Sequence, residues 1–239
     1  MLKNRLSIKI AYLYPDFLQS FCDKANLDVL KYRAKERNIN IEIEEIKNRD
    51  KINSSKYDFY YISGSNLEMI EICNKNLKNN YTELHVAVES NIPMLAINVG
   101  YVLFGKSFQL NNSPLYTSLG IFDCLTTITE NPILCKVIGK TTLLNKHNDI
   151  VGYSNRSTNT VLENGAKPFL TLKSGKTEGA IYKNVIGTYI TSPILGHNPY
   201  FCDYLIANCL KVRYKCSIPL TKLLDDIEWY SHNYLLEGK

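Results

Sequence analysis

Residues 93–105 read PMLAINVGYVLFG and form the most informative pattern in the sequence. An apolar run ends abruptly at one polar residue, Asn98, and a helix-compatible segment with a glycine follows at once. This pattern is typical of a nucleophile elbow, the sharp turn from strand to helix that presents a reactive side chain in α/β enzymes. The residue at its tip is an asparagine, whose carboxamide cannot attack a carbonyl carbon. The stretch therefore predicts an elbow without its nucleophile.

The chain before the elbow alternates between strand and helix patterns. β-branched and aromatic runs or a two-residue period predict strands, and apolar residues at three- to five-residue spacing predict helices. The expected strands are 6–14, 39–46, 57–64 and 94–97, and the expected helices are 17–38 and about 67–90. This alternation predicts an α/β fold with a doubly wound, mostly parallel sheet and flanking helices.

Parallel sheets of this kind bind ligands beyond the carboxyl ends of their strands. Two expected strands end in small or polar residues, Ser63-Gly64-Ser65 and Asn98-Val99. We expect these five residues to line one crevice, and they are the first candidates for ligand binding. Asn98 has a second interpretation, because asparagine is also a favoured N-cap of a helix.

The second half of the chain is richer in strand patterns. We expect strands at 133–138, 150–153, 180–182 and 185–190, with a hairpin turn at residues 183 and 184, and helices at about 200–211 and 221–236. Internal repeats and linkers are absent from the sequence, so residues 1–239 are expected to form one domain, with the last two helices as its C-terminal part.

Composition and charge exclude several classes of protein. Hydrophobic residues make up 45% and charged residues 21% of the chain, and the net charge is +5 with the lysines scattered. This balance does not favour a nucleic-acid partner. No apolar run is long enough for a membrane span. The first residues lack the pattern of a signal peptide, and the seven cysteines have no C-x-x-C spacing, so a disulfide framework is not expected. These features predict a cytoplasmic protein.

Several motifs, taken in order and with their spacing, give the chain a family resemblance. They are NLDVLKYRAKERNI at 26–39, GIFD at 120–123, EGAIYKNVIGTY at 178–189 and PILGHNPYFCDYL at 193–205. With them the chain resembles the CobB/CobQ-like group of class I glutamine amidotransferases, over about residues 8–210. Within the group it is most similar to the glutaminase subunits of lipid II isoglutaminyl synthases. The resemblance implies a flavodoxin-like core.

The chemistry of that family requires a cysteine nucleophile and a histidine base. Carried over along the motifs, the elbow cysteine falls on Asn98 and the histidine falls on Thr191, so both reactive groups are missing. The family's Gly-Gly-Gly strand end is Ser63-Gly64-Ser65 here. Its Asn-His-Gly-Gly-Arg loop is represented by residues 155–159, of which only Asn155 is retained. The resemblance therefore implies a degenerate site, with Asn155 as a further ligand-binding candidate.

Other residues could in principle take over the missing chemistry. Cys124 beside the GIFD motif is a possible relocated nucleophile, although a buried structural cysteine is commoner. Ser65 could supply a hydroxyl, and His197 could replace the base, although its GHNP context favours a helix start. The remaining histidines show no metal-ligand spacing, and we expect neither a metal nor a cofactor.

Three functional hypotheses follow from the resemblance. The leading one is a catalytically inactive amidotransferase-like protein that serves as a binding or structural subunit, with a Mur-ligase-like or other amide-forming partner. The second is an active amidase or transferase with relocated residues. The third is a sensor that binds glutamine or a related small molecule without turnover.

Overall fold

The computed structural model describes residues 5–237 except 19–22, 112 and 164. Its centre is a six-stranded sheet in the order β11-β12-β4-β3-β1-β2. The chain moves from β1 outward to β2 on one side, then to β3 and β4 on the other, which is the doubly wound arrangement that the sequence predicts. Neighbouring strands are parallel except in the β11–β12 hairpin. The strands are β1 (Ser7–Leu13), β2 (Asn40–Ile46), β3 (Phe59–Gly64), β4 (Met94–Asn98), β11 (Ala180–Tyr182) and β12 (Val185–Thr188).

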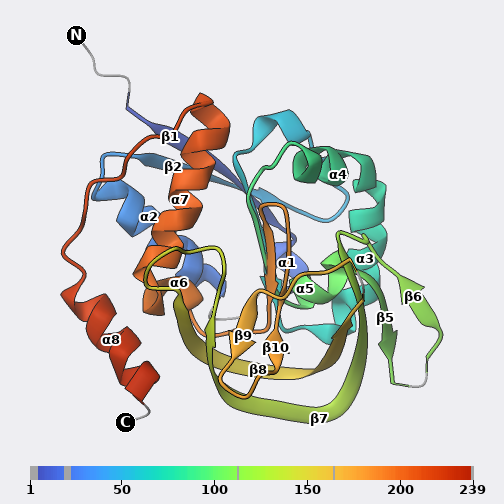
Figure 1. Ribbon diagram of the computed structural model, residues 1–239. Helices are drawn as coiled ribbons and strands as arrows, with labels where there is room; N and C mark the ends of the chain where they lie inside the picture. Colours follow the sequence, from blue (N-terminus) through green and yellow to red (C-terminus); the bar gives the residue numbers. More distant parts are fainter. Residues whose placement is uncertain (1–4, 19–22, 112, 164, 238–239) are drawn as a thin grey trace.

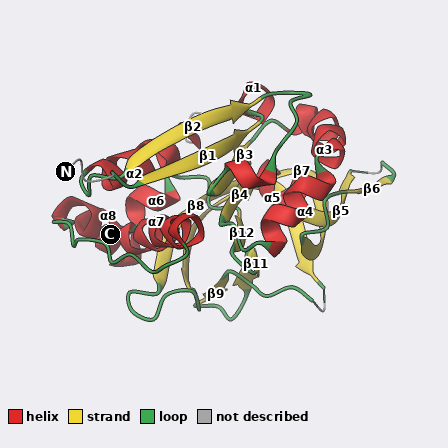
Figure 2. Cartoon of the chain, turned by 90° about the horizontal axis from the view of Figure 1, so that it is seen from above, coloured by secondary structure: helices red, strands yellow, loops and turns green. Residues whose placement is uncertain are grey.

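Helices cover both faces of this sheet (Figures 1 and 2). One face packs residues such as Tyr60 and Met94 against α1 (Pro15–Leu18), α3 (Ile70–Asn79), α4 (Tyr81–Glu89) and α5 (Val99–Phe104). The opposite face packs Tyr61 and Leu95 against α2 (Asp23–Lys35), α6 (Ile194–His197) and α7 (Pro199–Tyr214). Successive residues of β3 and β4 thus enter different cores, which explains why these strands are apolar almost throughout.

A second, strongly curved sheet follows the elbow in the chain. Its order is β10-β9-β7-β5-β6, and β8 pairs with β7 outside this path. The pair β7–β8 forms a long bent ribbon across the lower part of the molecule in Figure 1. An isolated bridge between Ser154 and Ile190 joins this ribbon to the chain just past β12. The strands are β5 (Gly105–Leu110), β6 (Leu115–Thr117), β7 (Phe122–Lys140), β8 (Asp149–Leu162), β9 (Leu170–Leu172) and β10 (Thr177–Glu178).

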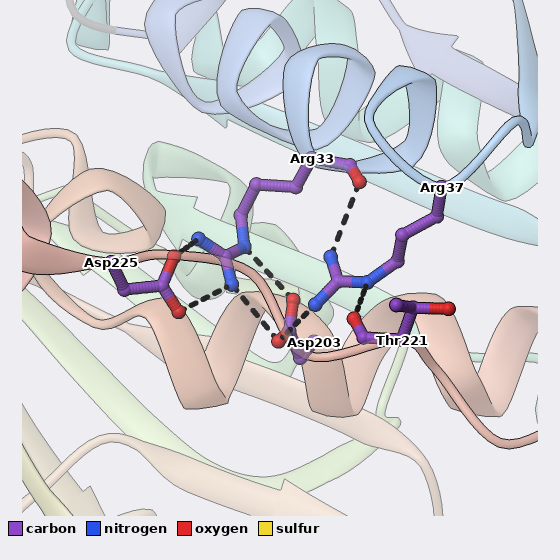
Figure 3. Close-up of polar contacts among 5 residues, drawn as sticks. All are labelled: Arg33, Arg37, Asp203, Thr221 and Asp225. Carbon is purple, nitrogen blue, oxygen red and sulfur yellow. Dashed lines mark hydrogen bonds and ion pairs between the residues drawn. The ribbon is translucent and has the colours of Figure 1, made fainter.

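Arg33 of α2 and Arg37 of the turn that follows it hold the C-terminal segment against the body (Figure 3). The Arg33 guanidinium donates to Asp203 Oδ1 at 2.8 Å and to Asp225 Oδ1 at 2.7 Å, and its side chain is 1% exposed. Arg37 donates to Asp203 Oδ2 and to the Thr221 carbonyl, both at 2.7 Å. These contacts fix residues 215–225 in an irregular path that leads to α8 (Asp226–Glu237).

The expected helix boundaries need three corrections. The helix expected at 17–38 is α1 and α2, with residues 19–22 outside the described part. The helix expected at 67–90 is a 3-10 turn (Leu67–Met69) followed by α3 and α4. These two separate at Asn80, whose side chain accepts from the Ile52 N–H at 3.0 Å and so ties the junction to a loop. The helix expected at 221–236 begins only at Asp226, because Asp225 binds Arg33 and the Thr221 carbonyl binds Arg37.

The second sheet was largely missed from the sequence. The strands expected at 133–138 and 150–153 are parts of β7 and β8, and β5, β6, β9 and β10 had no counterpart. Their sequences are short and mix polar with apolar residues, so no strand pattern stands out, and hydrogen bonds to neighbouring strands define them. The hairpin at residues 183 and 184 is confirmed, with Tyr182 opposite Val185. Within the described residues, no helix has the length and apolar character that a membrane span requires.

Candidate functional site

Asn98 lies at the tip of a true elbow between β4 and α5. Its backbone angles are φ 53° and ψ −110°, a combination outside the common regions for a residue with a side chain. Such a conformation costs on the order of 1–3 kcal/mol and persists only where the surroundings enforce it. Asn98 occupies the N-cap position of α5, but its side chain makes no capping hydrogen bond, so the capping interpretation of this residue is wrong.

Close packing beneath the elbow enforces this conformation. A Cβ atom at Gly100 would lie 2.6 Å from the Ile62 carbonyl oxygen, so only glycine lets α5 approach β3 this closely. The neighbours of Gly100 in α5 are all buried, among them Val99 at 1% exposure. The α5 backbone is therefore pressed onto the sheet, and the turn before it must be sharp.

The end of β3 lies beside the elbow. Ser63 pairs with Ile97 and Gly64 with Asn98 in parallel register. A Cβ atom at Gly64 would lie 1.8 Å from the Leu18 carbonyl oxygen, so α1 can only pass a glycine there. Ser63 is fully buried, whereas Ser65 is exposed. The structure thus brings together Ser63, Gly64, Asn98 and Val99 as the sequence predicts, with Ser65 at their rim.

Thr191, the position onto which the resemblance carries the family's histidine, follows the neighbouring strand β12. Thr188 of β12 pairs with Ile97, so the chain after β12 leaves the sheet at the same edge as the elbow. The Thr191 N–H donates to the Tyr153 carbonyl at 2.9 Å, and its hydroxyl accepts from the Asn155 N–H at 3.2 Å. Both contacts are with β8, so the threonine holds the chain after β12 against that strand.

Asn155 lies in a strand and not in the loop expected from the sequence. It belongs to β8, where it pairs with Leu134 of β7, and the residue faces solvent. Residues 155–159 are part of the continuous β7–β8 ribbon. Asn155 contacts Thr191 through its backbone, and its exposed side chain is not directed into the core with the residues of the elbow.

Cys124 and His197, the two residues considered as alternative catalytic groups, make contacts within the fold. Cys124 is fully buried in β7, and burial raises the pKa of its thiol to about 11. His197 Nδ1 hydrogen-bonds the Ser231 hydroxyl at 2.8 Å, and burial followed by the nearby His232 lowers its pKa. His197 thus anchors α8, at a distance in the fold from the elbow helix. The described residues hold no group of three or more His, Cys, Asp or Glu side chains that could bind a metal ion.

A polar cluster behind Thr191 was not singled out from the sequence. The Glu178 carboxylate accepts from the Tyr189 N–H at 2.6 Å and from the Thr188 hydroxyl at 3.0 Å. Burial raises the pKa of Glu178 to about 7, although these two hydrogen bonds and Arg156 oppose the shift. The only signal in the sequence was the Glu-Gly pair at 178 and 179, which belongs to the motif but was given no role.

The family motif GIFD lies elsewhere. Residues 120–123 line a surface cavity of about 320 Å³ together with His85 and Lys106. Lys106 Nζ contacts Glu163 at 2.6 Å and Asp123 at 3.4 Å, so the charges at this cavity are already paired. We place the candidate site at the strand edge of Asn98 and Thr191 rather than here, because the strained backbone of the elbow lies at that edge.

The fold and the elbow define a protein of the glutamine amidotransferase class. Residues 9–199 match the CobB/CobQ-like glutamine amidotransferase domain, and the chain belongs to this family. The flavodoxin-like core also matches a glutamine amidotransferase structure from Thermotoga maritima, with a TM-score of 0.52, 12% identity, and 95% of this chain and 93% of that chain covered. A second glutamine amidotransferase structure has a TM-score of 0.53 at 11% identity, covering 84% and 98%.

More similar sequences come from two bacterial proteins. The chain is 30% identical over 204 residues to subunit GatD of the glutamine-hydrolyzing lipid II isoglutaminyl synthase of Staphylococcus aureus (strain N315), covering 83% of each chain. It is 25% identical over 222 residues to the subunit of the same name from Streptococcus pneumoniae (strain ATCC BAA-255 / R6), covering 89% of this chain and 84% of that protein. The family resemblance inferred from the motifs is confirmed.

Proposed function

We propose that this chain is a non-catalytic member of its family that acts as a binding or structural subunit beside a Mur-ligase-like or other amide-forming protein. The observation that carries the proposal is an elbow with its strained backbone intact, φ 53° at the tip, that presents an asparagine. A carboxamide has no nucleophilic lone pair of useful reactivity, and a threonine hydroxyl cannot serve as a base near neutral pH.

The surroundings of Thr191 support the loss of the base. A catalytic histidine needs a free ring nitrogen directed at the nucleophile. The Thr191 hydroxyl instead accepts from the Asn155 N–H, and its backbone N–H is bound by Tyr153. Thr191 therefore forms part of the contact between β8 and the end of the central sheet.

The cysteines that could relocate the chemistry are in the wrong environment. Burial raises the pKa of Cys73 to about 12 and that of Cys124 to about 11, so both remain thiols at neutral pH. A thiol is a poor nucleophile compared with its thiolate. The hypothesis of an active enzyme with a relocated cysteine therefore has little support from these two residues.

The choice of partner rests on the relatives. The GatD proteins of Staphylococcus aureus and Streptococcus pneumoniae are described as subunits of a lipid II isoglutaminyl synthase, and the match covers more than four fifths of each chain. A chain that keeps such a fold throughout but loses its reactive groups can still supply a docking surface. The proposal accordingly includes a role in lipid II amidation and a cytoplasmic location.

Glutamine hydrolysis tests the catalytic half of the proposal. The purified protein should release no ammonia from L-glutamine, alone or with a candidate Mur-ligase-like partner. Loss of one member of a catalytic unit already costs orders of magnitude in rate, and losing a second adds little. Turnover of about 1 per second, an ordinary enzymatic rate, would refute this half.

Alkylation tests the assignment of the two positions. In the double variant Asn98→Cys with Thr191→His, a histidine that faces the new thiol should lower its pKa and accelerate its reaction with iodoacetamide. The single variant Asn98→Cys is the matched control. Equal rates in the two variants would mean that the positions do not face one another across the strand edge.

Affinity purification tests the partner half. A stable subunit contact should bury roughly 1,200–2,000 Å² and survive gentle purification from native cells. We expect a stoichiometric ligase-like companion. If the protein instead runs alone and binds L-glutamine in calorimetry without hydrolysing it, the sensor hypothesis replaces the subunit hypothesis.

A further inference from the structure

Three of the chain's four histidines gather at the attachment of the C-terminal helix α8, which lies at the edge of the molecule in Figures 1 and 2. His147 precedes β8, His197 ends α6, and His232 belongs to α8 itself. The fourth, His85, lies in α4. Histidine is the side chain that normally changes its charge between pH 5 and 8. The attachment of α8 is therefore the place where this fold can respond to a moderate change in pH.

Hydrogen bonds from two of these histidines join α8 to α6. His232 Nδ1 lies 2.9 Å from the His197 carbonyl oxygen, and since a carbonyl can only accept, this nitrogen carries the proton. His197 Nδ1 in turn hydrogen-bonds the Ser231 hydroxyl at 2.8 Å. Two successive residues of α8 thus bind the last residue of α6, one through its backbone and the other through its ring.

The third histidine takes part in an aromatic cluster on the same side of α8. The centroid of the Trp229 ring lies 5.1 Å from that of His147 and 5.2 Å from that of Tyr200. His147 also stacks on Tyr200 at 4.4 Å, and Trp229 meets His232 edge-on at 5.1 Å. Trp229 is the one tryptophan of the chain, so its fluorescence reports on this contact alone.

Apolar burial contributes little to the attachment of α8. His232 and Leu235 are its buried residues, and no residue of the described range 226–237 belongs to the two apolar clusters that form the body. The large apolar side chains Ile227 and Tyr230 are 82% and 75% exposed. Elements with few buried apolar contacts open at a fraction of the free energy of global unfolding. The helix can therefore detach while the rest of the fold remains intact.

Protonation of the two hydrogen-bonded histidines opposes the docked state. Burial lowers the pKa of His197, and the nearby His232 lowers it further. Burial also lowers the pKa of His232, although its bond to the His197 carbonyl and the charge of Asp149 oppose the shift. A solvated histidine has a pKa of about 6.5. Below that pH the undocked helix binds protons that the docked helix does not, so docking weakens as the pH falls.

Other titratable groups around α8 do not reverse this effect. Asp149 at the start of β8 favours the charged form of His232, whereas His147 disfavours it, and the net shift remains downward. The Asp225 carboxylate beside the helix is already paired with Arg33 at 2.7 Å. The other titratable groups are the phenol of Tyr200 on α7 and, on α8 itself, Asp226, Glu228, Tyr230, Tyr234 and Glu237.

We propose that α8 is a pH-responsive element, docked on α6 and the start of β8 at neutral pH and released in mildly acidic solution while the body stays folded. Uptake of protons by His197 and His232 drives the release. Arg33 still holds Asp225, so the released helix remains tethered at its first residue. Each histidine that takes up a proton only in the undocked state lowers the docking constant by up to about tenfold per pH unit. Release uncovers the faces of α6 and Tyr200 that α8 covers.

Quenching of Trp229 fluorescence by acrylamide measures the release in the intact protein. Acrylamide should quench weakly at about pH 7.5 and severalfold more strongly at about pH 5, and the change should reverse on return to neutral pH. Far-ultraviolet circular dichroism should keep most of its signal throughout. The quenching constant is preferable to the intensity, because a protonated His147 ring in contact with Trp229 would dim it without any movement.

The double variant His197→Asn with His232→Asn tests the role of the two histidines. The amide nitrogen of asparagine takes the place of Nδ1 and can keep both hydrogen bonds, but it does not titrate. This variant should stay docked at about pH 5. His85→Gln is the matched control, since it replaces a histidine of α4 that also bonds a carbonyl, that of Leu119. It should respond to pH like the wild type.

Hydrogen exchange of the wild type gives a second measurement if the double variant is undocked already at neutral pH. After correction for intrinsic rates, the amides of α8 should lose protection on acidification while those of α7 keep theirs. Three outcomes would each overturn the proposal: quenching of the wild type that does not change with pH, the same pH response in the double variant, or loss of the circular dichroism signal in step with the quenching.

Discussion

Replacing Glu178 by glutamine should change how stability depends on pH. The ordinary pKa of this carboxyl group is 4.5, and burial raises it to about 7 in the folded protein. Between these values the folded state holds a proton that the unfolded state has released, so stability falls as pH rises. Below pH 4.5 the raised pKa of Glu178 contributes its full stabilisation to the folded state, and above pH 7 that stabilisation has been lost.

The size of the effect follows from the shift. A difference of about 2.5 pKa units corresponds to about 3 kcal/mol, and partial exposure of the residue lowers the expected value to about 2 kcal/mol. Glutamine keeps an oxygen that can accept from the Tyr189 N–H, the shorter of the two contacts at 2.6 Å. The variant therefore removes the titration while retaining the main hydrogen bond.

Urea unfolding at pH 5 and pH 8.5, followed by far-ultraviolet circular dichroism, measures the effect. Other groups titrate as well, including the buried His197 and His232, but their contributions cancel in the difference between wild type and variant. The wild type should lose about 2 kcal/mol relative to Glu178→Gln between the two pH values. Glu36→Gln, at an exposed position, is the control and should show no such change. A difference that stays constant within about 0.5 kcal/mol would refute the reasoning.

Three further changes test the packing around the site and the contact between Arg33 and the C-terminal segment. Gly64→Ala places a Cβ atom 1.8 Å from the Leu18 carbonyl oxygen and should cost about 3 kcal/mol or more in thermal unfolding experiments. Asn98→Gly relieves the positive φ at the elbow and should stabilise the fold by about 1 kcal/mol, an outcome that a lower melting temperature would contradict. Asp225→Asn leaves part of the buried Arg33 charge unpaired, so the unfolding free energy should fall by about 3 kcal/mol and proteolysis of the C-terminal segment should accelerate.

The sequence was sufficient for the parts of the fold that follow local rules. The apolar strands 57–64 and 94–97 were found because both of their faces are buried, and the elbow was found because Asn98 interrupts such a run. The hairpin at residues 183 and 184 has a two-residue turn with positive φ at Lys183, and the short spacing of its strands indicated it. In each case a few consecutive residues determine the structure.

Features that depend on distant partners were not predictable. Residues 155–159 are polar and resemble a loop, yet they continue β8, because their backbones pair with β7 and their inward side chains meet Tyr189. Glu178 acquires its role through contacts with residues ten and eleven positions away. The helix expected at 221–236 starts late because Arg33, 192 positions earlier, holds Asp225. The residue types within one segment do not show which residues far away in the sequence that segment will contact.

Asn98 and Thr191 are held in place by different contacts. The conformation of Asn98 follows from close packing beneath it, because the neighbouring backbone approaches Gly64 and Gly100 so closely that neither position has room for a side chain. The shape of the elbow therefore depends on these two glycines and not on the side chain at its tip. Thr191 is different, because its side chain makes a contact of its own with the Asn155 N–H. A histidine there would leave that N–H without this acceptor and would place a bulkier ring against β8, so Thr191→His should weaken the attachment of the ribbon. The Thr191 side chain thus has a structural role of its own, because it helps to hold β8 against the end of the central sheet.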